Sequence, residues 1–547
     1  MAVWRRVLLL CSVLAGCGGS GSPGSDEGGQ GSDAPGDSTP SGGVGDRTEN
    51  PPTSEGPTTP EQPAPEQPSE PTPPSGETPE EPGTPTPPST PFGTPYLVRD
   101  IFPPASVDLP PWYGPAPSSL VAFGDRLFFA ANFEDGRGGL WTSDGSTGGT
   151  VELKGFPPDS AARQSSVQGL TPVGNQLFFS ARDDAQGREL WVTDGSVSGT
   201  RQVKDITPGT GDSNLSNLIR VGSRLFFLRT VTSAEDGASR SEVWTSDGSE
   251  AGTFRVKDLG AESYVSGTPT VLGGALFFTV DEPEHGAELW RTDGTEAGTR
   301  RVKDIEPGTG SAYPSSFQTA GGLLFFITDA PSRGQELWRT DGTEAGTQVV
   351  RVLPHTSSPV VSLMPGTGAN VFLARSGADH LMRLSSLEPT SAGGVLERDV
   401  ATLTNAYAAQ DDSDPSVTTY AVAGGKLFFG QAISSGGPAP RDVQLWVTDG
   451  TQAGTLQLAR PLSTSDEYQS PLFAVDDRVL FTGRGSDTGV EPWTSDGTVA
   501  GTTRVGDINP GAGGSFAYGF TRVGSTVYFV ADDGTHDYEL WALPITD

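Results

Sequence analysis

A twelve-residue segment occurs twice, letter for letter, in the second half of this chain. It reads Glu-Leu-Trp-Arg-Thr-Asp-Gly-Thr-Glu-Ala-Gly-Thr and occupies 288–299 and 336–347. Looser copies recur along most of the sequence, and adjacent copies place their tryptophans 46 to 53 residues apart. Self-similarity at a period of about 45 to 50 residues is typical of repeat architectures. The repeat therefore limits what the chain can fold into more than any other feature.

The tryptophan of the motif marks eight units and one interval of double length. Within that interval, Leu381-Met382-Arg383-Leu384 indicates a degenerate copy with Met382 in the tryptophan position. We therefore expect nine units. The eight tryptophans are Trp141, Trp191, Trp244, Trp290, Trp338, Trp446, Trp493 and Trp541.

Each unit contains four short apolar runs separated by Gly, Pro, Asp and Ser, which predicts four β-strands. The second run, such as Leu127-Phe128-Phe129, places bulky groups on both faces of one strand, because neighbouring side chains point oppositely. Such a strand has no solvent-facing side. Sheets stacked around a common axis bury both faces of their middle strands. The sequence thus predicts an all-β fold, a β-propeller of about nine four-stranded blades, with two smaller propellers as the alternative.

The two ends of the repeat region predict how the ring closes. The chain finishes on a third run, 539–544, with no fourth run behind it. The region begins with 96–101, which matches the fourth run of other units, for example Val203-Lys204-Asp205-Ile206. We expect this N-terminal strand to complete the last blade, so that the ring has no open sheet edge between its ends.

Residues 1–17 have the features of a bacterial lipoprotein signal peptide. Arg5 and Arg6 precede an apolar stretch too short to span a bilayer. The closing residues 14–17, Leu-Ala-Gly-Cys, resemble the lipobox of bacterial lipoproteins, which implies a lipid on Cys17. Gly18 follows Cys17 in place of the Asp that favours inner-membrane retention in that group. We therefore expect an outer-membrane-anchored protein of the cell envelope, periplasmic or surface-exposed, held to the membrane by its N-terminal lipid.

The remaining chain divides at a change in composition. Residues 18–95 are Gly/Ser-rich and then Pro/Glu/Thr-rich, which predicts a disordered tether. Residues 96–547 form the predicted propeller domain, expected to be a monomeric ring. The chain carries a net charge of −33, and −23 remains after the two arginines of the signal and the tether's 13 acids and one arginine are set aside. This charge argues against binding nucleic acid.

The Asp-Gly-Thr part of the motif predicts the turn from third to fourth strand. An Asp there accepts backbone N–H groups two residues on, and the glycines take positive φ at low cost. We expect a structural role for this turn. Its aspartates are Asp144, Asp194, Asp247, Asp293, Asp341, Asp449 and Asp496.

A ligand-binding or cation-binding face is predicted where the second-to-third loops differ most between units. Binding residues gather on variable loops held by a rigid scaffold. No acidic group has the spacing of a twelve-residue calcium loop, and Cys11 and Cys17 leave no cysteine for the ring. We expect no cofactor and no metal site, with Ca²⁺ as the open alternative. The candidates are Asp183, Asp184, Asp281, His285, Asp532, Asp533 and His536.

The sequence predicts no catalytic residue. It contains no His-Glu-x-x-His, Gly-x-Ser-x-Gly or phosphate-binding loop motif. The repeat itself resembles the bacterial ELWxxDGT-repeat proteins, which include lipoproteins and hyalin-like surface proteins. The resemblance implies a propeller-like surface protein and carries over no catalytic residue. We therefore expect a lipid-anchored, non-enzymatic binding or scaffold module for an envelope or extracellular protein or polysaccharide. The alternatives are a carbohydrate-active hydrolase or lyase on a propeller scaffold, and a purely structural envelope protein.

Overall fold

The computed structural model of this protein describes the repeat region with short gaps. The described residues are 91–102, 115–157, 167–235, 237–353, 361–406, 408, 414–433, 442–459, 471–485 and 488–546. The predicted signal peptide, Cys17, residues 18–90 of the predicted tether and His355 lie outside them. No helix in the described ranges is long and apolar enough to cross a membrane.

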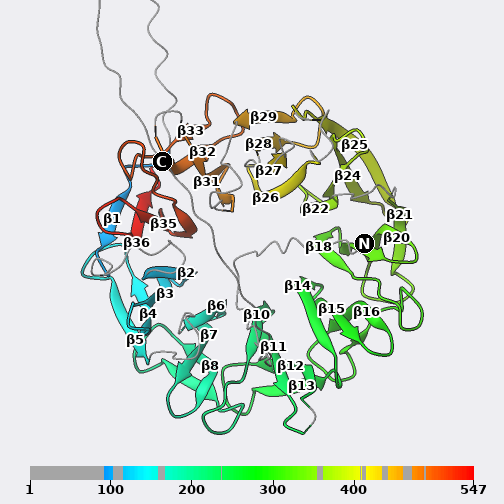
Figure 1. Ribbon diagram of the computed structural model, residues 1–547, viewed down its shortest axis with the longest axis horizontal. Helices are drawn as coiled ribbons and strands as arrows, with labels where there is room; N and C mark the ends of the chain where they lie inside the picture. Colours follow the sequence, from blue (N-terminus) through cyan, green and yellow to red (C-terminus); the bar gives the residue numbers. More distant parts are fainter. Residues whose placement is uncertain are drawn as a thin grey trace, which may run out of the picture. The chain divides into compact units, whose positions relative to one another are not determined.

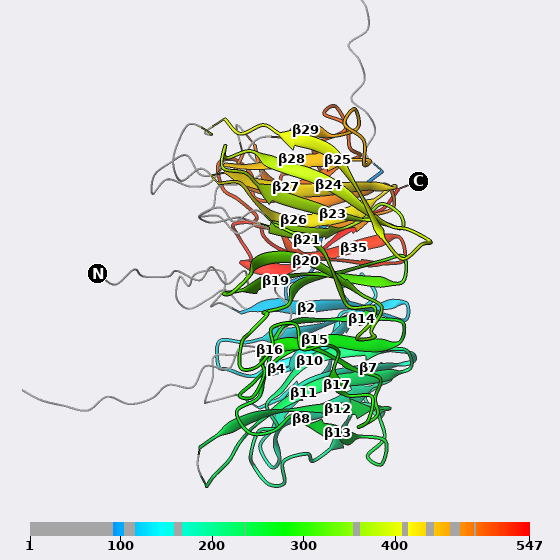
Figure 2. The same ribbon diagram turned by 90° about the vertical axis from the view of Figure 1, so that its right-hand side faces the viewer.

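The described residues form nine four-stranded antiparallel sheets arranged in one ring (Figure 1). This confirms the predicted nine-bladed β-propeller over the alternative of two smaller rings. We number the blades in chain order: blade 1 is β2–β5, and each following blade takes the next four strands up to β30–β33 in blade 8. Blade 9 combines β34–β36 with β1. Seen from the side, the strands run from one face of the ring toward the other (Figure 2).

The first strand of each blade lies nearest the ring axis and pairs with the second strand only (Figure 1). One edge of each innermost strand is therefore left outside the sheet. The innermost strands are β2 (Ala116–Phe123), β6 (Val167–Val173), β10 (Leu215–Val221), β14 (Tyr264–Leu272), β18 (Ser315–Ala320), β22 (Val361–Pro365), β26 (Ser416–Ala423), β30 (Phe473–Val475) and β34 (Tyr518–Val523).

The second strands carry the Leu-Phe-Phe run in six of the nine blades and are the most buried elements. They are β3 (Arg126–Asn132), β7 (Gln176–Asp183), β11 (Arg224–Thr232), β15 (Ala275–Glu282), β19 (Leu323–Ala330), β23 (Val371–Ser376), β27 (Lys426–Ile433), β31 (Arg478–Arg484) and β35 (Thr526–Asp532).

The third strands carry the Glu-Leu-Trp motif in most blades. They are β4 (Gly138–Ser143), β8 (Gly187–Thr193), β12 (Ser239–Ser246), β16 (Gly286–Thr292), β20 (Gly334–Thr340), β24 (Met382–Pro389), β28 (Asp442–Thr448), β32 (Val490–Ser495) and β36 (Tyr538–Pro544).

The fourth strands form the outer rim and vary most in length. They are β5 (Val151–Phe156), β9 (Arg201–Lys204), β13 (Phe254–Asp258), β17 (Arg300–Arg301), β21 (Gln348–Val352), β25 (Val395–Leu403), β29 (Leu456–Ala459), β33 (Thr503–Arg504) and β1 (Tyr96–Arg99).

The core lies between blades, and the paired phenylalanines build it from both sides. Phe128 packs against Leu177 and Phe179 of blade 2, whereas its neighbour Phe129 packs against Leu540 of blade 9. Both phenylalanines of blade 1 are essentially buried. Seven blades thus contribute one aromatic ring of the second strand to each of their two interfaces, because side chains alternate along a strand. Leucine takes one of the two places in the other two blades, as Leu373 in blade 6 and Leu480 in blade 8.

The ring closes by pairing its two ends, as the sequence predicts. In blade 9, β1 pairs antiparallel with β36, so that Leu97 lies opposite Trp541. The contact continues upstream, where the N–H of Gly93 donates to the carbonyl of Pro544 at 2.8 Å and Phe92 forms a bridge with Ile545. The closing contact is therefore longer than the predicted strand.

Blade 6 shows where the predicted alignment of the degenerate repeat is wrong. In blade 1, Phe129 lies opposite Trp141, and a register shift immediately precedes the tryptophan. In blade 6 the same place, opposite Leu373 and after the equivalent shift, is held by Ser385. Met382 lies three residues earlier and packs in the core. Without a tryptophan to mark it, the position can be located only from the strand pairing.

Candidate functional site

The predicted acidic candidates lie at the ends of strands that are joined by tight hairpins. Asp183 is the last residue of β7, and β8 begins at Gly187. Asp281 lies within β15, and Asp532 is the last residue of β35. The second-to-third connections of these blades are therefore short turns on extended strands.

These acidic residues make local contacts and do not meet in a common site. Asp183 accepts the N–H of Ala185 at 2.8 Å, and Asp532 accepts that of Gly534 at 2.6 Å. Asp184 and Asp281 are exposed. The residues belong to blades 2, 4 and 9, and the part of the chain that the structure describes contains no group of three or more His, Cys, Asp or Glu that could hold a metal ion.

The two candidate histidines each lie beside an aspartate. His536 Nδ1 is 2.8 Å from Asp533 Oδ2, and this hydrogen bond raises the pKa of His536. Burial pushes the pKa of Asp533 upward, but its hydrogen bonds with His536 outweigh burial and lower that pKa. His285 Nδ1 lies 3.7 Å from Asp304 Oδ2, beyond hydrogen-bond distance.

A further His–Asp pair was not predicted. His380 Nδ1 lies 2.7 Å from Asp414, although the two residues are 34 positions apart, and no local signal in the sequence joins them. In this pair and in the His536 pair the aspartate faces Nδ1, which leaves Nε2 as the nitrogen that could accept a proton. Within the described ranges, neither imidazole is hydrogen-bonded to a Ser, Thr or Cys side chain.

The aspartates of the motif hold the turn from third to fourth strand together. Asp144 Oδ1 accepts the N–H of Ser146 at 2.9 Å and its hydroxyl at 2.7 Å, and the Ser146 hydroxyl accepts the N–H of Gly149 at 3.0 Å. The same contacts recur at Asp194, Asp247, Asp293, Asp341, Asp449 and Asp496.

The two glycines of this turn are required for different reasons. Gly145 has a φ of 90°, which favours glycine. Gly149 does not have positive φ, but a Cβ there would lie 2.0 Å from Asp144 Oδ1. The prediction that both glycines take positive φ is therefore wrong for the second one, which is fixed by the close approach of the aspartate.

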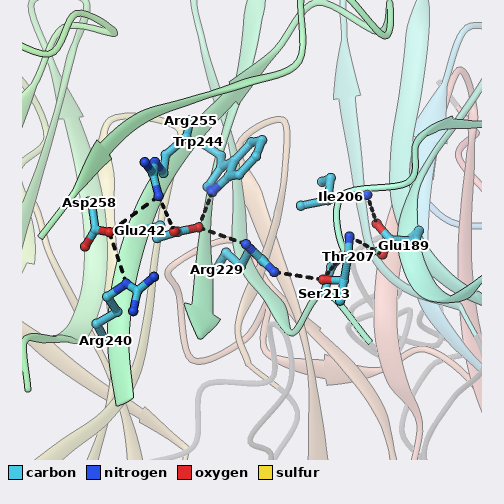
Figure 3. A network of polar contacts seen from close by, with 10 residues as sticks. All are labelled: Glu189, Ile206, Thr207, Ser213, Arg229, Arg240, Glu242, Trp244, Arg255 and Asp258. Atoms are coloured by element: carbon cyan, nitrogen blue, oxygen red, sulfur yellow. Dashed lines mark hydrogen bonds and ion pairs between the residues drawn. The ribbon is translucent and has the colours of Figure 1, made fainter. Parts of the chain in front are cut away.

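The sequence interpretation overlooked the glutamate of the motif, which is buried in one of two arrangements (Figure 3). Glu189 in blade 2 accepts the N–H groups of Ile206 and Thr207, at 3.0 and 3.1 Å, and a hydrogen bond from the Ser213 hydroxyl. These donors all lie in the link from β9 to blade 3. The carboxylate thus fixes the passage from one blade to the next.

Glu242 in blade 3 faces charged and aromatic partners instead (Figure 3). Its oxygens accept from Trp244 Nε1 at 2.8 Å, Arg255 at 2.8 Å and Arg229 at 3.1 Å. The second guanidinium nitrogen of Arg229 donates to the Thr207 hydroxyl at 2.8 Å. Arg229 therefore connects the two arrangements across the interface of blades 2 and 3.

The two arrangements shift the glutamate pKa in opposite directions. Burial raises the pKa of Glu189 despite its hydrogen bonds. At Glu242 burial acts in the same sense, but Arg255, Trp244 and Arg229 outweigh it and lower the pKa. Blades 4 and 9 follow Glu189: burial raises the pKa of Glu288 to about 7 and that of Glu539 to about 8. Glu539 accepts the N–H groups at 101 and 102, directly after the closing strand.

The surface nearest the ring axis differs in composition from the rest of the ring. The nine innermost strands contain no Asp, Glu or Lys, and their charged residues are Arg220 and Arg522. Each of these arginines donates from Nε to the carbonyl of the glycine two residues later. The acidic ring thus has a lining with no acidic residue and with two arginines as its charged groups. We call this lining, formed by the nine innermost strands, the axial surface.

The axial surface is also interrupted in a regular way. Seven innermost strands have a register shift in their pairing with the second strand. Left-handed residues occupy most of these shifts, among them Ser119 (φ 54°), Asn217 (φ 50°) and Ser316 (φ 57°). Ser119 and Ser316 are exposed. Hydroxyl and amide groups therefore lie beside the free strand edges.

Comparisons with known proteins identify no family for this chain. No family model matches the sequence, and no curated protein matches it. Similar solved structures include the acylaminoacyl peptidase of Pyrococcus horikoshii (11% identity, 70% of this chain and 57% of that chain, TM-score 0.34). Another is prolyl oligopeptidase B from Galerina marginata (12%, 68% and 56%, TM-score 0.38). A third is the β-propeller domain of the Trilobed protease from Pyrococcus furiosus (12%, 61% and 95%, TM-score 0.31).

These matches correct the predicted function. The sequence predicted a non-enzymatic binding or scaffold module, with a carbohydrate-active enzyme as the alternative, and a chain that is not an enzyme. The similar structures are peptidases, which contradicts both predictions. At 11 to 13% identity and TM-scores of 0.34 to 0.38, however, they carry no activity over to this chain. This chain spans a little over half the length of the peptidases first matched. The likeness is one of fold, and a role in peptide hydrolysis is a proposal for this chain.

Proposed function

We propose that this protein is the propeller of a peptidase system and that its axial surface receives extended polypeptide. The observation that carries the proposal is the lack of acidic residues on the axial surface of an otherwise acidic ring. A polypeptide main chain presents neutral N–H and C=O groups, which the free edges of the innermost strands and their hydroxyl and amide neighbours can pair with. Acidic side chains on this surface would compete for the main-chain donors and repel acidic segments.

The register shifts decide which kind of contact the surface offers. A regular free edge would take up another strand along its whole length, and bulges are a device that prevents this. The left-handed residues at Ser119, Asn217 and Ser316 limit pairing to short stretches. Short contacts contributed by several blades suit a polypeptide that must pass or be released, because no single blade holds it tightly.

The test adds charge to the axial surface. The triple variant carries Ser119→Asp, Asn217→Asp and Ser316→Asp. Aspartate tolerates the positive φ of these three positions. The matched control adds the same charge outside, at the exposed positions Val197, Val349 and Leu456. The full chain is incubated with an unfolded, alkylated polypeptide, and its retention and cleavage are measured by gel filtration and mass spectrometry.

The wild type and the outer variant should retain or cleave the polypeptide. The axial variant should bind the polypeptide about tenfold more weakly, which corresponds to roughly 1.4 kcal/mol. Equal behaviour of the two variants, or a wild type that neither retains nor cleaves polypeptide, would contradict the proposal. Thermal unfolding of both variants checks that the ring is intact.

The His–Asp pairs give the proposal a second readout. A base with a free Nε2 and an aspartate on Nδ1 is one half of a hydrolytic site. If the chain itself cleaves polypeptide, His380→Ala or His536→Ala should abolish cleavage and leave retention unchanged. If cleavage persists in both variants, the hydrolytic residues lie elsewhere, and these pairs have a structural role.

Membrane attachment through Cys17, the outer-membrane location and membership of the ELWxxDGT-repeat group are likewise proposals. Their support is the lipobox-like sequence at 14–17 and the repeated motif. Mass spectrometry of the mature N-terminus would show a lipid-modified Cys17 if the first is right. An unmodified N-terminus, or one that begins elsewhere, would contradict it.

A further inference from the structure

A pocket of about 520 Å³ opens on the outer rim of blade 4. It is lined by residues of three successive blades, with Lys257 from blade 3, Glu344 from blade 5 and the remainder from blade 4. Its volume is within the range of about 300 to 1,000 Å³ that small-molecule sites occupy. The outer strand β17 beside it has only two paired residues, and after the hydrogen bond from the Val302 N–H to the Leu289 carbonyl, at 2.8 Å, Lys303 and Asp304 continue along the pocket.

Three buried polar atoms of the pocket lining have no hydrogen-bond partner within the described part of the chain. They are Trp290 Nε1, His285 Nδ1 and Asp304 Oδ1. Trp290 is more than nine-tenths buried, with 8% of its surface exposed. An unpartnered buried donor or acceptor lowers stability. The equivalent atoms of blade 2, Trp191 Nε1 and Asp205 Oδ1, are also unpartnered among the described residues, so the lysines of the blade 4 pocket are what set it apart.

The repeat explains why the indole of Trp290 is unpartnered. In blade 3 the equivalent indole N–H donates to Glu242, and in blade 5 Trp338 donates to Glu336 at 3.0 Å. In blade 4 the motif glutamate, Glu288, instead accepts two backbone N–H groups of the link to blade 5. The acceptor that serves the tryptophan in blades 3 and 5 is therefore already engaged.

Two lysines of the pocket are also unengaged. In blade 2, Lys204 donates to the carbonyl of Thr253 at 2.9 Å. Lys257 and Lys303 follow a valine and precede an aspartate as Lys204 does, yet among the described contacts neither has an ion pair or hydrogen bond. The pair Arg301–Glu282, 2.6 Å apart, neutralises itself. Free cations and the free acceptor of Asp304 therefore line one pocket.

We propose that this rim pocket binds the free ends of a short peptide. Its carboxylate would be held by Lys257, Lys303 and the indole N–H of Trp290, and its ammonium group by Asp304. A simple anion would leave Asp304 Oδ1 unsatisfied, and a simple cation would leave the lysines and the indole unsatisfied. A short zwitterionic peptide satisfies both sets. The inference rests on the proposed role in peptide hydrolysis for its ligand class, because such peptides are its products.

Calorimetric titration of the full chain tests the proposal. The probes are trialanine, its N-acetylated form, its C-terminal amide and inorganic phosphate. Trialanine should bind, and blocking either end should weaken binding by about tenfold or more, since each block removes a charged contact. No binding of trialanine, or phosphate binding as tightly as trialanine, would overturn the proposal, the latter by assigning the pocket to simple anions.

Variants locate the binding. Lys303→Met and Asp304→Asn should each weaken trialanine binding by about tenfold, and their thermal unfolding shows whether the ring remains folded. Lys204→Met in blade 2 is the matched control and should leave binding unchanged. Equal binding by Lys303→Met, Asp304→Asn and wild type would overturn the assignment to this pocket.

The axial variant separates this inference from the proposed function. If that variant loses polypeptide retention and keeps trialanine binding, the two sites are independent and both proposals stand. If wild type binds trialanine at the rim and neither retains nor cleaves polypeptide, the proposed function fails and the pocket remains. If trialanine does not bind while polypeptide is still retained, only the proposal for the rim pocket fails.

Discussion

Blades 2 and 3 place the same residue of the same motif in opposite environments. Glu189 accepts backbone and hydroxyl donors of the link that follows its blade, whereas Glu242 accepts from two arginines and a tryptophan (Figure 3). The links differ in sequence: blade 2 continues with Ile206-Thr207-Pro208-Gly209, and blade 3 with Leu259-Gly260. The comparison teaches that six of the nine blades keep a buried glutamate at this position, while the neighbouring link decides what the carboxylate holds.

The largest loss of stability is expected when the charge of Glu242 is removed. Glu242→Gln should lower the free energy of unfolding by about 3 kcal/mol, because Arg229, whose side chain is 16% exposed, loses its buried counter-charge. Denaturant unfolding measures the change. Glu250→Gln, at an exposed site of the next turn, is the control and should change stability by less than about 0.5 kcal/mol. A cost as small as the control would show that Arg229 finds a partner elsewhere.

Removing the other carboxylate should cost somewhat less. Glu189→Ala leaves two backbone N–H groups unpaired and should lower stability by about 2 kcal/mol. Glu189→Gln keeps an acceptor oxygen without the charge, so it should cost less than Glu242→Gln. If the two Gln variants are equally destabilised, the distinction between a backbone-binding and a charge-binding glutamate is wrong.

The stability contributed by the two classes of glutamate should change with pH in opposite directions. Raised pKa values at Glu288, to about 7, and at Glu539, to about 8, mean that the folded ring holds protons the unfolded chain has released. Their contribution is complete below the ordinary glutamate pKa near 4.5 and is lost as pH rises through about 7 to 8. The pKa of Glu242 is lowered, so the stability that Glu242 contributes is lost as pH falls through that lowered value.

Unfolding free energies measured across this range check the signs. Glu288→Gln and Glu539→Gln should reduce the loss of stability between about pH 4.5 and 8. Glu242→Gln should reduce the loss on the acid side instead. Parallel pH profiles for all three variants would contradict the assignment.

The smallest effect concerns the contact between the two arrangements. Thr207→Val removes the acceptor for Arg229 and should cost about 1 kcal/mol. A double-mutant cycle with Arg229→Met should give a coupling energy of at least about 0.5 kcal/mol, because the residues are in direct contact. Additive effects would mean that the two glutamate arrangements are independent.

The sequence predicts the fold well because its strongest signals are steric. The paired phenylalanines must be buried on both faces of their strand, which predicts the ring. The last unit lacks a fourth run and an extra run lies near Val98, which predicts how the ring closes. The predicted alignment is wrong in blade 6, where no tryptophan marks the register and Ser385 takes the position assigned to Met382. Hydrogen-bond register is a property of strand pairs and cannot be read from one degenerate repeat.

The candidate site could be predicted only in part. The motif aspartates were placed in their turn from local chemistry, since their partners lie within five residues. The acidic loop residues were grouped as one face, but they belong to separate hairpins. The His380–Asp414 pair joins a loop of blade 6 to the link before β26, 34 residues later, and leaves no local signal. The lack of acids in every first run was present in the sequence, but it became meaningful once the ring placed those runs around one axis.

Site-specific crosslinking tests the central claim most directly. In a chain whose Cys11 and Cys17 are replaced by serine, a single cysteine at Ser316 on the axial surface, or at Val197 on the outside, carries a photoreactive crosslinker. The account predicts that unfolded polypeptide is captured by the label at Ser316 and not by the label at Val197. Capture at Val197 equal to or above capture at Ser316 would contradict it.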